Sequence, residues 1–263
     1  MRVHEPRAGA GAGSGSGVGT GSGSGLGTAS GLGTGSAARG TRTKPAAWCE
    51  DPYDDALRDG RGPLFLRRED GWLLPLEVER WCAEPDPADL SVLARCRGAV
   101  LDIGCGPGRL VAALAARGHP ALGLDVSREA VARTERLGGL ALCRSVFDPL
   151  PGQGRWDTAL LIDGNIGIGG DPARLLRRLR EVTGPEAIVV AECLAVEVDE
   201  CCEVRIDNGR GGYGAPFAWA RVGPQALHRH AEHAGWARRT QWSVAGRVFL
   251  ELAPRPQPSA PPS

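Results

Sequence analysis

The sequence contains almost no lysine, since Lys44 is the only one among its 263 residues, and its charges cancel, with 31 basic against 31 acidic side chains. Proteins that bind nucleic acids usually carry an excess of basic residues on one face. A formal net charge of +0 indicates no such excess. We therefore expect no nucleic-acid partner.

Long apolar runs and paired cysteine motifs are missing as well. A membrane-spanning helix needs about 20 mostly apolar residues, and the chain has no run of that kind. The start, MRVHEPRAGAGAGSG, has no apolar core of a secretory signal. None of the 8 cysteines belongs to a CxxC pair, which disfavours a structural zinc site. We expect a cytoplasmic protein with reduced thiols, no membrane association and no metal site.

Composition divides the chain into four parts. Residues 1–46 form a Gly/Ser-rich leader and residues 254–263 a Pro-rich tail, and both have too little apolar surface to fold. Residues 47–97 form an N-terminal extension, and residues 98–253 form the main domain. The folded part is long enough for one core of good size.

The extension itself contains two predicted elements. Two apolar runs within Pro63–Leu76 flank Asp70-Gly71, a dipeptide that tolerates positive φ, and this pattern predicts a β-hairpin. The segment PADLSVLARC predicts a short helix with Asp86 or Ser91 as its cap.

Strands and helices alternate strictly through the main domain, which predicts an α/β fold with a mostly parallel sheet between two helical layers. An antiparallel strand pair with a turn at Ala245-Gly246 is expected to close the sheet and bring it to seven strands. The predicted strands are residues 99–104, 121–127, 140–146, 157–164 and 187–195, followed by the pair within 237–253. The predicted helices are residues 108–118, 128–139, 171–184 and 223–236, with Ser127 and Asp171 as caps.

The loop after the first of these strands, in VLDIGCGPGRL (Val100–Leu110), has glycine at every second position. Glycines there permit a tight turn and let a ligand lie on the backbone N–H groups. A dinucleotide fold would need a small residue where Arg109 stands, and Pro107 removes one N–H from an anion site. Asp102 before the loop favours a ligand with an ammonium group over a diphosphate. A methionine moiety has that ammonium together with a carboxylate.

Two further positions in the sequence suit a ribose and a purine. Asp125 ends the second strand, where a carboxylate can accept both hydroxyl hydrogens of a ribose. Phe147 and Asp148 follow the third strand, suited to packing on a purine and to accepting from its exocyclic amine. Together these groups describe S-adenosylmethionine as the cofactor.

From residue 99 to 252 the chain resembles the class I, Rossmann-like, S-adenosylmethionine-dependent methyltransferases, and it looks similar to small actinobacterial methyltransferase-domain proteins. The motifs that carry the resemblance are VLDIGCGPGRL, GLDVS, SVFDPLP, WDTALLIDGNIG and DPARLLRRLREVTGPEAIVVAE. The resemblance implies a Rossmann-like three-layer sandwich and a methyl transfer to a small-molecule acceptor. It also implies the cofactor residues, which are Asp102, Gly104, Cys105, Gly106, Gly108, Asp125, Val126, Phe147 and Asp148.

Many relatives that methylate small molecules have a histidine after the fourth strand, but DGNIGIGGDP has none. Asp163 and Asn165 stand there instead and are the candidate catalytic residues, as a base or as acceptor-orienting groups. The alternative is that they cap the loop turn. Residues 192–223 are expected to cover the acceptor pocket, with the glycine-rich NGRGGYGAP as a lid and Arg205 or Arg221 available to an acidic acceptor.

Two other functions fit parts of the pattern. The first is a cofactor-binding scaffold or sensor that no longer transfers methyl groups. The second is a nicotinamide-dependent dehydrogenase, which Arg109 in the glycine motif disfavours. The sequence favours no particular acceptor or oligomeric state.

Overall fold

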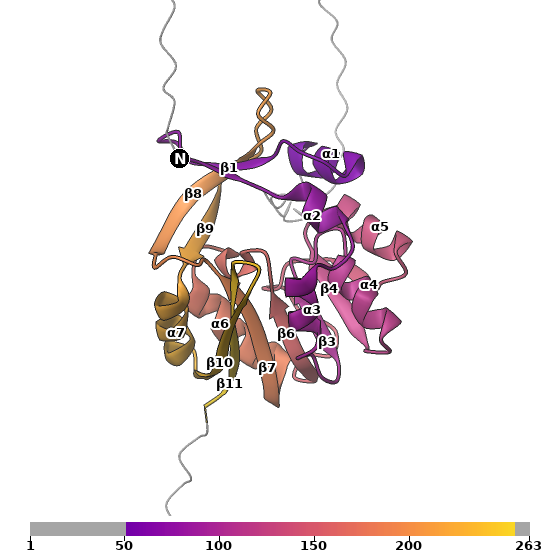
Figure 1. The fold of residues 1–263 in the computed structure, drawn as a ribbon, viewed down its shortest axis with the longest axis vertical. Coiled ribbons are helices and arrows are strands. Elements are labelled where there is room, and N and C mark those ends of the chain that lie inside the picture. The colour runs from indigo at the N-terminus through magenta and orange to yellow at the C-terminus, as the bar shows by residue number, and fades with distance from the viewer. Residues whose placement is uncertain (1–50, 256–263) are drawn as a thin grey trace, which may run out of the picture. The chain divides into compact units, whose positions relative to one another are not determined.

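A seven-stranded sheet lies at the centre of the computed structural model, which describes residues 51–255 (Figure 1). The predicted leader and most of the predicted tail lie outside the described residues. The strand order is β10-β11-β7-β6-β3-β4-β5. The strands β3 to β7 are parallel to one another. The bounds are β3 Val100–Ile103, β4 Ala121–Asp125, β5 Ala141–Cys143, β6 Trp156–Leu161, β7 Thr183–Cys193, β10 Trp236–Val244 and β11 Arg247–Pro254.

The sheet confirms the predicted topology. β3 pairs with β4 on one side and β6 on the other, so the strand order reverses at β3. β10 and β11 are antiparallel, and their turn places Ala245 at φ 50° and Gly246 at φ 80°. In an open α/β sheet the reversal point marks where ligands bind, outside the carboxyl ends of the strands.

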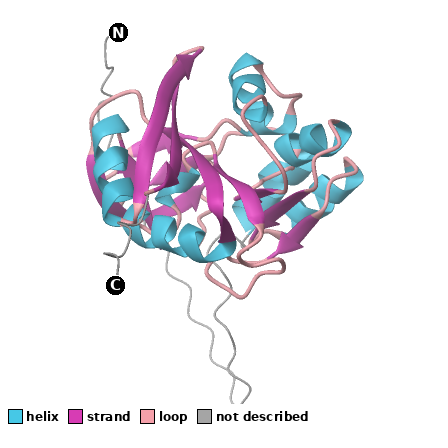
Figure 2. Ribbon diagram, turned by 90° about the horizontal axis from the view of Figure 1, so that it is seen from below, coloured by secondary structure: helices cyan, strands magenta, loops and turns pink. Residues whose placement is uncertain are grey.

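Helices pack on both faces of this sheet and make the predicted three layers (Figure 2). Leucines of α6 and α7 bury against one face, and residues of α3 and α4 bury against the other. The predicted caps are present, since Asp86, Ser127 and Asp171 each accept a backbone N–H in the first helical turn. The helices are α3 Pro87–Leu93, α4 Arg109–Ala116, α5 Arg128–Arg136, α6 Pro172–Val182 and α7 Pro224–His233.

A second sheet, here called the cap sheet, joins two segments that are distant in sequence. Its order is β2-β1-β8-β9, and all its pairings are antiparallel. The hairpin of β1 (Phe65–Arg67) and β2 (Leu73–Pro75) was expected, whereas the pairing of β1 with β8 (Asp199–Asp207) was not. β9 (Phe217–Val222) completes the sheet, which Figure 1 shows above the ends of the central strands.

The cap sheet has its own small core. Leu66 on β1 and Ile206 on β8 are direct partners, and both are buried. The helices α1 (Asp51–Asp59) and α2 (Val78–Cys82) add Leu57 and Val78 to the same cluster. The α1–α2 part of the N-terminal extension therefore shares a core with the 192–223 insertion, whereas α3 packs on the central sheet.

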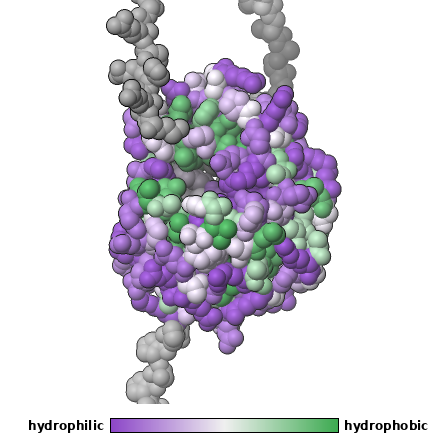
Figure 3. Space-filling model, viewed as in Figure 1, coloured by the Kyte–Doolittle hydropathy of each residue, from purple (hydrophilic) through white to green (hydrophobic). Residues whose placement is uncertain are grey.

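The insertion is mostly paired strand, with the glycine-rich stretch confined to its tip. Asn208 orders that tip, because its side-chain oxygen accepts from the N–H groups of Arg210 and Gly212. Hydrophobic and hydrophilic residues are interspersed over the face drawn in Figure 3. Within residues 51–255, no helix combines the length and the apolarity that crossing a membrane requires.

Candidate active site

A cavity of about 280 Å³ opens between the carboxyl ends of the parallel strands and the cap sheet. Its floor comes from the segments at the ends of four neighbouring strands: residues 103–107 after β3, 124–126 after β4, 144–147 after β5, and Asp163 and Asn165 after β6. Its opposite wall comes from α1, the start of α2 and β9. The cavity therefore lies at the place where this sheet topology binds ligands.

The glycine loop forms part of the floor. Gly104, Gly106 and Gly108 have φ of 72°, 53° and 86°, which L side chains rarely adopt. A Cβ on Gly104 would lie 2.6 Å from Asn165 Nδ2, and one on Gly108 would lie 2.3 Å from Thr134 Oγ1. A Cβ on Gly106 would meet only a tyrosine hydroxyl, at 3.7 Å. Packing thus demands glycine at the two outer positions, and the middle one leaves space on the cavity side.

Cys105 has a structural position within the loop. It borders the cavity, yet its side chain is buried and lies 3.9 Å from Thr134 Oγ1. Burial raises the pKa of the Cys105 thiol, so the group is neutral. A Cβ on Gly123 of β4 would come within 2.5 Å of its sulfur, and this close packing fixes the loop on the sheet.

Asp125 connects the end of β4 to the glycine loop. Its Oδ2 accepts from Gly106 N at 3.0 Å, and its Oδ1 accepts from Ser127 N at 2.8 Å. Burial raises the pKa of Asp125 to about 6, and the backbone N–H donors lower it in part. Asp125 and the adjacent Val126 both border the cavity.

Asp102 is a buried carboxyl group with an unused oxygen. It is 2% exposed, and its Oδ2 has no hydrogen-bond partner among the described residues. Burial raises the pKa of Asp102 to about 7, although the nearby Arg109 guanidinium opposes the shift. Its neighbours Ile103 and Gly104 border the cavity, whereas Asp102 itself does not.

The end of β5 lies earlier than the sequence pattern suggested. The strand stops at Cys143, and Ser145, Val146 and Phe147 therefore border the cavity. Asp148 does not border it, because its exposed carboxylate turns back to accept from Ser145 N at 3.2 Å. The structure thus brings Phe147 to the cavity but not Asp148, and the assignment of both to the cofactor stays a prediction.

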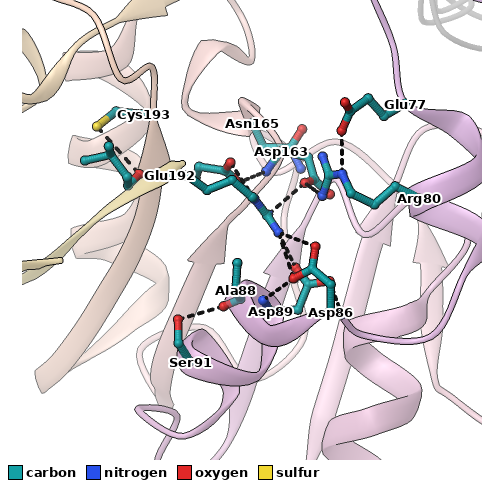
Figure 4. A network of polar contacts seen from close by, with 12 residues as sticks. Glu77, Arg80, Asp86, Ala88, Asp89, Ser91, Asp163, Asn165, Glu192 and Cys193 are labelled. Carbon is teal, nitrogen blue, oxygen red and sulfur yellow. Dashed lines mark hydrogen bonds and ion pairs between the residues drawn. The ribbon is translucent and has the colours of Figure 1, made fainter. Parts of the chain in front are cut away.

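Asp163 pairs with three arginines from three different segments, and Figure 4 shows Arg80 beside it. Its Oδ1 accepts from Arg80 at 2.8 Å and from Arg247 at 3.0 Å, and its Oδ2 accepts from Arg109 at 2.8 Å. Asp163 itself has φ 58°, an unfavourable conformation that these ion pairs help to stabilise. The carboxylate of Asp163 therefore bonds arginine side chains and does not cap the loop turn.

The same network continues away from the cavity. Arg109 also donates to Asp89 through Nε (2.8 Å) and Nη2 (3.0 Å). Arg247 donates two hydrogen bonds of 2.8 Å to Glu192. Burial would raise the pKa of Asp89, but hydrogen bonds from Arg109 and Arg247 outweigh it and lower the pKa to about 2. No sequence pattern indicated this arginine network. Arg109 stood out only because it does not fit the dinucleotide motif.

Asn165 fastens the loop after β6 to the end of β3. Its Nδ2 donates to the carbonyl oxygens of Ile103 and Gly104, at 2.9 Å each. Both Asp163 and Asn165 border the cavity, as the sequence predicted, but each is already bonded within the protein.

Sequence reasoning found only part of the cap side. Phe217 and Trp219 of the insertion border the cavity, and Tyr53, Leu76 and Trp81 of the N-terminal extension join them unexpectedly. The two arginines considered for an acidic acceptor lie elsewhere. Arg205 lines a separate surface cleft beside Tyr213, and Arg221 pairs with Glu200.

Comparison with known proteins identifies the domain. The family described as "Methyltransferase domain" matches residues 78–242, which is most of the described chain. The chain belongs to this family. The methyltransferase family and the Rossmann-like fold predicted from the glycine motif are thereby confirmed.

Solved structures agree at the level of the fold. An S-adenosylmethionine-dependent methyltransferase from Bacteroides fragilis, in complex with S-adenosylhomocysteine, has a TM-score of 0.65 and 20% identity, covering 76% of this chain and 92% of its own. The CcbJ methyltransferase from Streptomyces caelestis has a TM-score of 0.50 and 14% identity, covering 65% and 90%. A methyltransferase from Methanosarcina mazei has a TM-score of 0.50 and 15% identity, covering 65% and 99%.

Proposed function

We propose that this methyltransferase-family protein transfers a methyl group from S-adenosylmethionine to a small-molecule acceptor. The observation that carries the proposal is the buried carboxyl group of Asp102, whose Oδ2 is unpartnered in the strand that precedes the glycine loop. A buried carboxyl without a hydrogen bond is costly, and a ligand ammonium would offset that cost. The similar methyltransferase structure from Bacteroides fragilis supports the same ligand class, since it is a complex with S-adenosylhomocysteine.

Arg109 supplies the complementary charge for the carboxylate of a methionine moiety. Its Nε and Nη2 are bonded to Asp89 and Asp163, which leaves Nη1 as the nitrogen without a bond in the described part of the chain. Arg109 borders the cavity, and its acidic partners raise its pKa, so it stays charged. An amine next to Asp102 and a carboxylate next to Arg109 would match both halves of a zwitterion.

The nucleoside half fits the next two strand ends. Asp125 has a carboxylate at the cavity wall that can accept ribose hydroxyls, and its pKa of about 6 leaves it largely ionised at neutral pH. Phe147 offers an apolar ring for the purine, and the guanidinium of Arg174 lies 4.4 Å from the centre of that ring. Ser145 and Val146 lie beside it and offer polar and backbone groups to the base.

S-adenosylmethionine supplies a methyl group that is already activated by its sulfonium centre. The residues of this chain then have to align the acceptor and exclude water. We assign Asp163 to positioning, because both of its oxygens accept from guanidinium groups and neither is available to take a proton. Asn165 positions the same wall by bonding the carbonyl groups at the end of β3.

The cap-side wall of the cavity, which the proposed cofactor contacts leave uncovered, supports transfer to an acceptor over a silent binding protein. Calorimetry with S-adenosylhomocysteine and with NAD tests the cofactor directly. We expect binding of the first ligand and none of the second, with a matching rise in melting temperature for the first alone. Tight binding of NAD without S-adenosylhomocysteine binding would refute the proposal.

A further inference from the structure

The cavity has two chemically different sides. The floor, which the proposed cofactor occupies, carries backbone N–H groups, Asp125 and Arg109. The opposite side carries apolar and aromatic residues from three segments: the N-terminal extension, β9, and the loop that follows β6. These residues are Tyr53, Leu76, Trp81, Ile168, Phe217 and Trp219.

Four aromatic rings on this side are arranged as two edge-on pairs. Tyr53 and Trp81 lie 6.5 Å apart at 73°, and Phe217 and Trp219 lie 6.1 Å apart at 88°. Trp81 and Phe217 are only half-buried, so each keeps ring surface for a ligand to cover. Walls of this kind favour another aromatic ring, which can stack or stand edge-on against them.

The aromatic side offers no group that would neutralise a charged acceptor. None of the described residues that border it is charged, and Arg221 on β9 is engaged by Glu200. Burying an unpaired charge there would be costly. The acceptor also has to share the cavity of about 280 Å³ with the proposed cofactor, which leaves limited room. The acceptor should therefore be small and uncharged.

A buried donor on the same wall indicates a heteroatom in that ligand. The indole nitrogen of Trp81 is buried and has no hydrogen-bond partner among the described residues. Buried N–H groups usually find a partner, and an unmet one costs free energy. A ring nitrogen in the acceptor would supply the missing partner.

The titratable groups that border the cavity leave no base for a hydroxyl acceptor, and Asp102, which does not border it, is assigned to the ammonium group of the cofactor. Asp163 is held by three arginines, and Asp125 accepts from the glycine loop and from Ser127. Burial and the proximity of Asp125 raise the pKa of Tyr53, and burial raises that of Cys105, so both groups keep their protons. No histidine is found among the described residues that border the cavity.

We propose that the methyl acceptor is a small, uncharged heteroaromatic amine, held between the aromatic pairs of the cap side. This inference rests on the proposed function. The amine nitrogen uses its own lone pair to bond the methyl carbon as the carbon–sulfur bond breaks. The bonding electrons remain on sulfur, which becomes the neutral thioether of S-adenosylhomocysteine. The nitrogen then loses its extra proton to water, so no protein base takes part.

Four probes separate the features of this acceptor. The first, 6-aminoquinoline, is an uncharged heteroaromatic amine. The second, 4-aminobenzoate, adds a negative charge. The third, glucosamine, removes the aromatic ring and carries a positive charge, because its amine is largely protonated at neutral pH. The fourth, 6-hydroxyquinoline, replaces the amine by a hydroxyl. We expect 6-aminoquinoline to bind the complex with S-adenosylhomocysteine by calorimetry, and to be methylated when S-adenosylmethionine is supplied. The charged and non-aromatic probes should do neither.

A pair of variants tests the wall itself. Phe217→Ala should weaken 6-aminoquinoline binding by about tenfold, as expected for loss of a ring contact, and leave S-adenosylhomocysteine affinity unchanged. Phe217→Tyr should restore the binding. Tyr213→Ala is the matched control, since Tyr213 is 49% exposed on the same hairpin and outside this cavity, and it should change neither affinity.

The pH profile reports on the base. With saturating S-adenosylmethionine and above the titration range of Asp102, methylation of 6-aminoquinoline should be independent of pH up to about pH 9, whereas any methylation of 6-hydroxyquinoline should rise with pH as the phenolate forms in solution. The inference is overturned if 6-aminoquinoline fails to bind while S-adenosylhomocysteine binds, or if 4-aminobenzoate or glucosamine is methylated in its place. Failure of S-adenosylhomocysteine itself to bind would instead refute the proposed function.

Discussion

Nη2 of Arg109 lies 2.8 Å from Oδ2 of Asp163 and joins the helix after the glycine loop to the loop after β6. The other oxygen of Asp163 accepts from Arg80 of α2 and Arg247 of β11. One carboxylate thereby links the cap side, the glycine loop and the C-terminal strand around a single edge of the cavity.

Replacing that carboxylate should loosen all three connections. Asp163→Asn keeps the size and tolerates the positive φ, so the change isolates the charge. We expect the free energy of unfolding to fall by about 3 kcal/mol, since three partly buried guanidinium groups lose a shared partner. Urea unfolding measures this. Glu77→Gln, which alters an exposed partner of Arg80, should cost less than about 1 kcal/mol, and equal losses would contradict the central role of Asp163.

Asp102 should make stability and cofactor binding depend on pH in opposite ways. Its pKa rises from 3.8 to about 7 in the folded protein, so its stabilising contribution is complete below about pH 4 and is lost as the pH rises through about 7. Cofactor binding instead needs the ionised form, so affinity should increase over the upper part of that range.

The variant Asp102→Asn separates the two effects. Without ligand, its melting temperature should fall less than that of the original protein between about pH 5 and pH 8, because no buried carboxyl has to ionise. Its affinity for S-adenosylhomocysteine should drop by about 1.5–3 kcal/mol through loss of a charged hydrogen bond. A variant with unchanged affinity would remove Asp102 from the site.

The glycine loop allows a matched test of packing against backbone strain. Gly108 and Gly118 have similar φ, 86° and 79°, but only at Gly108 would a Cβ overlap a neighbour, Thr134. Gly118→Ala should cost about 1 kcal/mol from strain alone, and Gly108→Ala about 1–3 kcal/mol more from overpacking. Chemical unfolding of both variants measures the difference. Equal costs would mean that the loop yields freely at Gly108.

Asp125 and Asp148 are both acidic residues after neighbouring strands, yet only Asp125 borders the cavity. Asp125→Ala should weaken S-adenosylhomocysteine binding by about 1–3 kcal/mol, because the ribose loses a charged acceptor. Asp148→Ala should leave the affinity unchanged, since its carboxylate contacts Ser145 N instead. Calorimetry on both variants decides the assignment, and the opposite ranking would restore Asp148 to the site.

The central sheet could be predicted because its signals are local. Apolar runs ending in glycine or aspartate mark the strands, and caps such as Ser127 and Asp171 mark the helices between them. The position of Asp148 outside the cavity could not be anticipated, because β5 ends at Cys143, and such an end is set by pairing with β4, which no local pattern records.

The cap side and the arginine network could not be predicted for the same physical reason. Pairing of Arg67 with Arg205 joins residues far apart in sequence, and the period-2 pattern of a strand does not specify its partner. The ion pairs of Asp163 likewise draw on Arg80 and Arg247, whose spacing carries no motif. Most of the residues that the sequence indicated in advance lie on the floor of the site, in the glycine loop and at the ends of the next strands.

The structure of the protein crystallised with S-adenosylhomocysteine tests the central claim most directly. The account predicts the amine of the ligand beside Asp102, its ribose hydroxyls within hydrogen-bond distance, about 3.2 Å or less, of Asp125, and its purine against Phe147. A nucleoside bound away from Asp125, or an amine that faces no carboxyl group, would contradict it.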